Sequence, residues 1–161
     1  MVGNRRHALA YADSPQREDA PRQQDAPHQR GTGDRERPGA VIATGVNQVT
    51  PTHDPTAHAE VVAIRNACRK LNSFQLMGCE IYTTCEPCPM CLGATYWARP
   101  ARVYYASTRK DAARAGFDDS FIYDQLELPQ SERAIPCIPV SHAEAHAPFQ
   151  AWEQRKDKVP Y

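Results

Sequence analysis

Two short motifs that contain metal-binding residue types constrain the fold of this chain more than any other feature. The first reads His58-Ala59-Glu60 and stands at the beginning of an apolar run with helical spacing. The second reads Pro-Cys-x-x-Cys, with its cysteines at Cys88 and Cys91, and begins another such run. Side chains in the first turn of a helix lean toward its N-terminus. The sequence therefore predicts a fold in which two helix starts meet around one metal ion.

The donor set His58, Cys88 and Cys91 predicts a catalytic zinc centre. Zn²⁺ takes four tetrahedral ligands, and a catalytic site leaves one of them to water. The ion lowers the pKa of this water from ~16 toward ~7, which makes a nucleophile available at neutral pH. Glu60 is not needed as a ligand and is predicted to move protons, a role worth roughly 10²–10⁴ in rate. We expect a hydrolytic enzyme with one Zn²⁺ per subunit.

The six cysteines leave other interpretations open. Three disulfides in a secreted protein are one, but a chain of this length does not need that framework, and C-x-x-C favours metal in a reducing compartment. A knuckle of Cys85, Cys88 and Cys91 without His58 would instead be a closed structural zinc site. The protein would then be a zinc-stabilised, non-catalytic module in which Glu60 has no role. We interpret the remaining cysteines as small buried hydrophobic residues: Cys68, Cys79, Cys85 and Cys137.

The charge of the chain is balanced, because Lys+Arg and Asp+Glu both number 19. No net basic field recruits nucleic acid or anionic membrane. A local basic patch would escape this count, so an RNA substrate is disfavoured but not excluded. No apolar run approaches the ~20 residues of a membrane span, and the first residues lack the apolar core of a signal peptide. We expect a soluble, cytoplasmic protein without a membrane partner.

Residues 1–38 differ in composition from the rest of the chain. Large apolar side chains are scarce there, whereas Arg, Asp, Gln and Pro are frequent. Such a segment buries too little apolar surface to offset its ordering entropy. We predict disorder for 1–38 and one folded domain over 39–161. Because the composition changes sharply near residue 39, we hypothesise a shifted reading frame or a misplaced start for the first segment.

The apolar pattern of residues 39–161 predicts alternating strands and helices. We predict strands at 40–46, 79–84 and 102–106, an edge strand at 135–140, and a loop over 48–54. We predict helices from Pro55, capped by Asp54, to Leu71, from 89 to 99, over 121–126, and over 142–156 with an interruption at Pro148. This alternation implies right-handed crossovers and a largely parallel sheet with helices on its faces.

Several segments resemble bacterial guanine deaminases of the cytidine deaminase superfamily. H-A-E with P-C-P-M-C is the signature of zinc deaminases that act on nucleobases. Because tRNA adenosine deaminases share it, this signature indicates the chemistry and not the substrate. The segment at 115–123, Ala-Gly-Phe-Asp-Asp-Ser-Phe-Ile-Tyr, and the aromatic tail from Pro148 to Tyr161 favour guanine. The resemblance runs from about residue 40 to the end of the chain.

The resemblance implies an α/β fold, a three-layer α/β/α sandwich with a mixed central sheet. It implies a homodimer that exchanges C-terminal segments and converts guanine to xanthine and ammonia, with deamination of tRNA adenosine as the alternative. The family's first strand, which pairs with the strand predicted at 40–46, is not visible in residues 1–38. The residues that the resemblance assigns to the purine are Asn47, Ala59, Asp119 and Tyr161.

Overall fold

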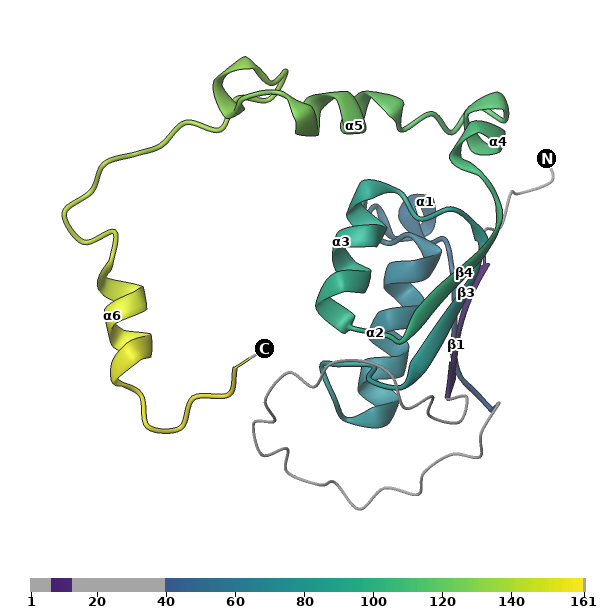
Figure 1. Ribbon diagram of the computed structural model, residues 1–161, viewed down its shortest axis with the longest axis horizontal. Helices are drawn as coiled ribbons and strands as arrows, with labels where there is room; N and C mark the ends of the chain where they lie inside the picture. The colour runs from purple at the N-terminus through teal and green to yellow at the C-terminus, as the bar shows by residue number, and fades with distance from the viewer. Residues whose placement is uncertain (1–6, 13–39, 161) are drawn as a thin grey trace, which may run out of the picture. The chain divides into compact units, whose positions relative to one another are not determined.

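The computed structural model describes residues 7–12 and 40–160 (Figure 1). The chain divides into two compact units between Asp118 and Asp119. The first unit contains, in chain order, β1 (His7–Ala12), β2 (Val41–Val46), α1 (Val49–Thr52), α2 (Ala59–Leu71), β3 (Cys79–Cys85), α3 (Pro89–Ala98), β4 (Arg102–Ser107) and α4 (Arg109–Arg114). The second unit contains α5 (Ser120–Glu127), the 3₁₀ helix η1 (Gln130–Glu132) and α6 (Ala147–Gln154).

The strands described in the first unit form one mixed sheet in the order β2-β1-β3-β4. β1 is antiparallel to both of its neighbours, whereas β3 and β4 are parallel. The register pairs Leu9 with Thr44 on one side and with Tyr82 on the other. The α/β fold with a mixed sheet is therefore confirmed. The largely parallel sheet predicted from the alternation of strands and helices is wrong, because β1 separates β2 from β3.

β1 lies within the segment 1–38, for which we predicted disorder, and the structure corrects that prediction at residues 7–12. The sequence His-Ala-Leu-Ala-Tyr-Ala is short and rich in alanine, so it does not indicate a strand by itself. Its conformation depends on pairing with β2 and β3, which lie far along the chain, and a local pattern does not report such pairing. The other residues of 1–38 lie outside the described part of the chain.

α2 begins later than predicted. The predicted start was Pro55 with Asp54 as its cap, but the helix begins at Ala59 with His58 as its N-cap. The Asp54 carboxylate instead accepts hydrogen bonds from the backbone N–H and the hydroxyl of Thr56, at 2.8 and 2.6 Å. Aspartate before proline favours a local turn of this kind, which competes with helix formation. As a consequence His58 lies at the tip of the helix.

The elements from β3 to β4 match their predicted ranges to within one residue. α3 begins at Pro89, where the missing proline N–H is harmless, and stops at Arg99, whose backbone is left-handed with φ of 54°. Two short α-helices of the first unit were not predicted, namely α1 inside the predicted loop 48–54 and α4 after β4. A capping box between Thr108 and Asp111 begins α4, and this signal is visible in the sequence.

α2 and α3 lie on the same face of the sheet (Figure 1). Apolar side chains from both helices pack against the strands there. The core joins Ile42 of β2, Ile64 and Ala67 of α2, Ile81 of β3 and Ala98 of α3. Burial of aliphatic side chains contributes roughly 1.5–3 kcal/mol each. This core holds α2 and α3 on the same sheet and thereby fixes the positions of their N-terminal ends.

The described residues of the second unit, 119–160, contain no buried residue. α5 confirms the helix predicted at 121–126. The strand predicted at 135–140 is not formed, so its apolar residues are exposed. The last helix begins at Ala147 rather than at residue 142, with Pro148 in its first turn. Cys137 is exposed, contrary to our interpretation. No helix in the described part of either unit has the length and apolar character needed to cross a membrane.

Candidate active site

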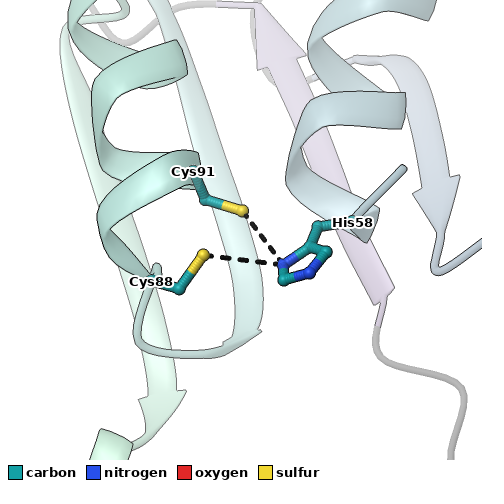
Figure 2. Close-up of side chains that lie close together, drawn as sticks. All are labelled: His58, Cys88 and Cys91. Carbon is teal, nitrogen blue, oxygen red and sulfur yellow. Dashed lines mark hydrogen bonds between the residues drawn. The ribbon is translucent and has the colours of Figure 1, made fainter. Parts of the chain in front are cut away.

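The imidazole of His58 and the thiols of Cys88 and Cys91 meet where α2 and α3 begin (Figure 2). His58 and Cys88 are the N-cap residues of their helices, and both have extended backbone angles. Cys91 lies in the first turn of α3 and is fully buried. The His58 Nδ1 atom is 3.6 Å from the Cys88 sulfur and 3.5 Å from the Cys91 sulfur. Val61 of α2 belongs to one buried apolar cluster with Cys88 and Cys91, so apolar packing joins the two helix starts.

These three side chains fit a zinc ion. Their ligand atoms all lie within 4.8 Å of one another, and no other such group of three occurs among the side chains described in residues 40–160. Tetrahedral coordination at ordinary Zn–S and Zn–N lengths places nitrogen and sulfur ligands roughly 3.5 Å apart, close to the distances observed. The Cys85 sulfur instead faces the Thr108 carbonyl oxygen at 3.8 Å and lies outside the group. The alternative three-cysteine knuckle is therefore not formed.

The two thiols of the site differ in protonation. The neighbouring Cys91 thiol lowers the pKa of Cys88 to about 4, and His58 contributes in the same direction, against the effect of burial. The neighbouring Cys88 sulfur, burial and the charge of Glu60 raise the pKa of Cys91. Zinc coordination needs both sulfurs as thiolates, so metal binding is coupled to release of the Cys91 proton.

The carboxylate of Glu60 is buried beside the ligand group. Glu60 is only 4% exposed and belongs to the first turn of α2, where the positive end of the helix dipole favours an anion. The Cys91 sulfur donates to its Oε2 atom at 3.5 Å, and the Thr83 hydroxyl donates to its Oε1 atom at 3.2 Å. An acid in this position can hold a proton and return it next to the metal ligands.

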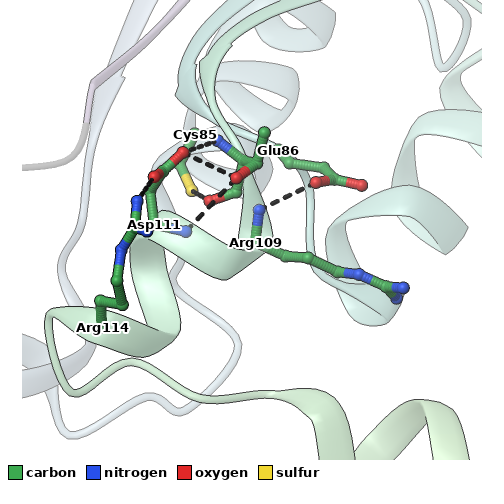
Figure 3. Close-up of polar contacts among 6 residues, drawn as sticks. Cys85, Glu86, Arg109, Asp111 and Arg114 are labelled. Atoms are coloured by element: carbon green, nitrogen blue, oxygen red, sulfur yellow. Dashed lines mark hydrogen bonds and ion pairs between the residues drawn. The ribbon is translucent and has the colours of Figure 1, made fainter.

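The turn that leads into α3 is anchored to the start of α4 (Figure 3). The backbone N–H of Glu86 donates to the Ser107 carbonyl, and the backbone N–H of Arg109 donates to the Glu86 carboxylate, both at 2.8 Å. Asp111 caps the same end of α4. Cys88 lies two residues after Glu86. The hydrogen bonds that Glu86 makes with Ser107 and Arg109 therefore also restrict the position of the Cys88 sulfur.

The residues assigned to the purine fall in different parts of the chain. Asn47 follows β2, and its Oδ1 atom accepts a hydrogen bond from the Val49 N–H at 3.1 Å, which orients its amide group. Ala59 is buried and stands between His58 and Glu60 in the sequence. Asp119 belongs to the second unit, where it precedes α5 and makes no capping hydrogen bond through its side chain. The last assigned residue, Tyr161, lies outside the described residues.

Sequence reasoning missed three residues that shape this site: Gly45, Thr83 and Glu86. Gly45 lies inside β2, and a glycine within a strand is a signal of close backbone approach. Thr83 places a hydroxyl on the otherwise apolar inward face of β3. The alternation of inward and outward residues along the strand could have predicted that this hydroxyl is buried. Glu86 and Pro87 are recognisable as a turn into the following helix, but the contact of Glu86 with Arg109 was missed because Arg109 lies in a helix that was not predicted.

Comparison with known proteins extends these observations. The family model for the cytidine and deoxycytidylate deaminase zinc-binding region matches residues 36–107, which include both motifs. A guanine deaminase from Bacillus subtilis (strain 168) is 58% identical over 123 residues, 76% of this chain and 79% of that protein. An X-ray structure of guanine deaminase from Bacillus subtilis matches with a TM-score of 0.80 at 47% identity, and the match covers 97% of this chain and 83% of that chain.

A second class of relative matches a smaller share of the chain. A tRNA-specific adenosine deaminase from Aquifex aeolicus (strain VF5) is 46% identical over 72 residues, 45% of this chain and 48% of that protein. Both the identity and the covered share are lower than for the guanine deaminase from Bacillus subtilis.

Proposed function

The chain belongs to the guanine deaminase branch of the zinc-dependent cytidine and deoxycytidylate deaminase family, and we propose on this premise that it converts guanine to xanthine. The reaction consumes one water, whose oxygen replaces the exocyclic amino group, and releases ammonia. The observation that carries the proposal is the buried Glu60 carboxylate beside the ligand sulfur of Cys91. A structural zinc site does not need a buried acid there, which disfavours the non-catalytic module.

Each group of the centre receives a role in this proposal. His58, Cys88 and Cys91 hold the zinc ion. The ion, when bound, polarises a water so that it acts as a nucleophile at neutral pH. Glu60 takes a proton at its carboxylate, delivers it to a ring nitrogen of the purine and later protonates the departing amine. The helix starts of α2 and α3 add two positive dipole ends that favour anionic groups at this point.

Substrate recognition is assigned to Asn47, Ala59, Asp119 and Tyr161. Asparagine and aspartate together match the donor and acceptor edge of guanine. Buried polar pairs of this kind discriminate strongly, because an analogue that lacks a partner leaves them unsatisfied. The orientation of the Asn47 amide by Val49 supports its part in this assignment.

We also propose a homodimer that exchanges the segment after Asp118. The support is energetic: residues 119–160 bury no side chain, although they carry large apolar residues. Phe121, Ile135, Ile138 and Phe149 are each more than 60% exposed. A segment with so little buried apolar surface does not fold on its own, because nothing offsets its ordering entropy. A second copy of the chain would supply the missing cover.

We also propose that the protein is cytoplasmic. None of the six cysteines, all of which lie in the described part of the chain, forms a disulfide. A site that needs thiolates as metal ligands is compatible with a compartment that keeps cysteines reduced.

The alternative function is deamination of adenosine in tRNA. That reaction needs a surface for the RNA backbone and a flipped base, and the chain carries no net positive charge to attract RNA. The smaller share of the chain matched by the tRNA-specific relative also favours guanine.

A substrate panel separates the two functions. The purified full chain, with its zinc content measured, is incubated with guanine, guanosine, adenosine and tRNA. We expect one zinc per subunit and release of ammonia from free guanine. Inosine formation in tRNA without release of ammonia from guanine would support the alternative, and zinc without any deamination would support the non-catalytic module.

A further inference from the structure

The inward face of β3 carries a single hydroxyl. Cys79, Ile81, Thr83 and Cys85 alternate along the strand and are all buried, and three of them are apolar or weakly polar. Cys79 and Ile81 belong to the hydrophobic core beneath α2 and α3. A threonine in this row is costly unless its hydroxyl has a partner. The partner is the Oε1 atom of Glu60, at 3.2 Å.

Thr83 offers a rigid point of attachment. Its residue position pairs with Ala8 on one side and with Tyr105 on the other, so β3 is supported by strands on both sides at this register. A β-branched side chain has few χ1 rotamers, which fixes the direction of the hydroxyl. Groups held by sheet scaffold position a neighbouring side chain more accurately than groups on loops.

The two hydrogen bonds on the Glu60 carboxylate come from different parts of the site. The Cys91 thiol, which belongs to the group that fits zinc, donates to Oε2 at 3.5 Å. The Thr83 hydroxyl lies outside that group and donates to Oε1 at 3.2 Å. Of the two contacts described here, the one from Thr83 therefore uses no residue of the proposed zinc site.

We propose that Thr83 is a positioning residue that holds Oε1 of Glu60, so that Oε2 faces the ligand group and carries the proton transfers. This inference rests on the proposed function of Glu60. Thr83 touches neither the zinc ligands nor the substrate in this assignment. Thr83 affects the reaction rate only by orienting the Glu60 carboxylate. A small misplacement of a catalytic group can lower a rate by about 10²-fold.

Two substitutions at position 83 test the proposal. Thr83→Val keeps the shape and removes the hydroxyl, whereas Thr83→Ser keeps the hydroxyl and removes the methyl group. We expect Thr83→Val to lower kcat for guanine by about 10–100-fold with KM and zinc content nearly unchanged. Thr83→Ser should stay within about threefold of the natural protein in kcat. Equal kcat for Thr83→Val and the natural protein, or equal losses in both variants, would overturn the proposal.

A second readout does not depend on turnover. Urea unfolding of the chelator-treated protein is measured for Thr83→Val, Glu60→Ala and the double variant. A direct contact predicts that Thr83→Val shifts the unfolding midpoint less in the Glu60→Ala background than in the natural one. Equal shifts in both backgrounds would contradict the contact. If the natural chain releases no ammonia from guanine, the proposed function fails, and this cycle still decides whether Thr83 holds Glu60.

Discussion

Gly45 of β2 lies against the backbone of Ala63 of α2 more closely than any side chain would allow. A β-carbon at position 45 would lie 2.5 Å from the Ala63 nitrogen and closer still to the carbonyl oxygen of Ala59. Both partners are backbone atoms, which cannot rotate away. Because α2 carries His58 at its tip and Glu60 in its first turn, this contact sets the depth at which the proposed catalytic groups lie on the sheet.

Gly45→Ala is predicted to push α2 away from β2. We expect a loss of unfolding free energy of about 1–3 kcal/mol or more, together with reduced zinc content. Gly93→Ala on α3 is the matched control, because a β-carbon there meets nothing within 4 Å. The free energy of unfolding of Gly93→Ala should rise by about 0.5–1 kcal/mol, because alanine has a higher helix propensity than glycine. Urea unfolding and zinc analysis check both variants, and an unaffected Gly45→Ala protein would refute the close packing.

Glu86 is predicted to matter through the turn that it anchors. Glu86→Ala removes the acceptor for the Arg109 N–H, a bond to a charged group worth about 1.5–3 kcal/mol. We expect zinc to be lost more readily to a chelator, because the turn before Cys88 is less restrained. Glu86→Gln keeps an acceptor oxygen and should be milder. Chelator competition measures the rate of zinc loss, and identical rates for all three proteins would contradict this role.

Glu80 is predicted to make stability depend on acid pH. Hydrogen bonds from Tyr82, Arg102 and Tyr104 hold the pKa of its carboxyl below its usual value of 4.5. A carboxyl whose pKa is lower in the folded than in the unfolded protein stabilises the fold above the unfolded value, and this contribution disappears as pH falls through the folded value. Glu80→Gln should therefore be less stable than the natural protein at pH 7.

The pH series supplies the control for Glu80. The stability difference between the natural protein and Glu80→Gln should shrink as pH falls below 4.5. Glu132→Gln, at an exposed position, should leave stability at pH 7 nearly unchanged. Denaturant unfolding across pH 3–7 measures both variants. If the stability difference between the natural protein and Glu80→Gln grows as the pH falls, the pKa of Glu80 is not lowered in the folded protein, and the prediction is wrong.

Cys91→Ser is predicted to abolish zinc binding, because a serine hydroxyl is a poor substitute for a thiolate ligand. The loss should lower apparent stability as well, on the order of 4 kcal/mol where zinc is present at 1,000 times its Kd. Cys137→Ser is the control, since that cysteine is exposed and lies outside the ligand group. Metal analysis and thermal unfolding compare the two, and retained zinc in Cys91→Ser would exclude it as a ligand.

The ligand group could be predicted from the sequence because its chemistry depends on local spacing. His58 lies two residues before Glu60, and Cys88 three residues before Cys91, at the starts of two helices that the apolar pattern indicates. Once both helices pack on one face of a sheet, their first turns have little freedom. The three side chains come together even though α2 begins at Ala59 rather than at Pro55.

The missed features depend on contacts between distant parts of the chain. β1 is a strand because it pairs with β2 and β3, whereas its own residues do not predict a strand. The partnership of Thr83 with Glu60 spans two elements, as does the approach of Gly45 to Ala63. Residues 135–140 have the apolar character of a strand but no neighbouring strand in the described second unit, so the pattern alone was misleading.

The proposed reaction requires that the zinc ligands and Glu60 have separate roles, with Glu60 transferring protons and binding no metal. Glu60→Gln retains the shape of the side chain and removes its ability to accept and return a proton. Zinc content and ammonia release from guanine are measured on the same preparation. We predict one zinc per subunit and a loss of turnover of roughly 10²–10⁴-fold. Unchanged ammonia release in a zinc-loaded Glu60→Gln protein would contradict the role of Glu60 in proton transfer.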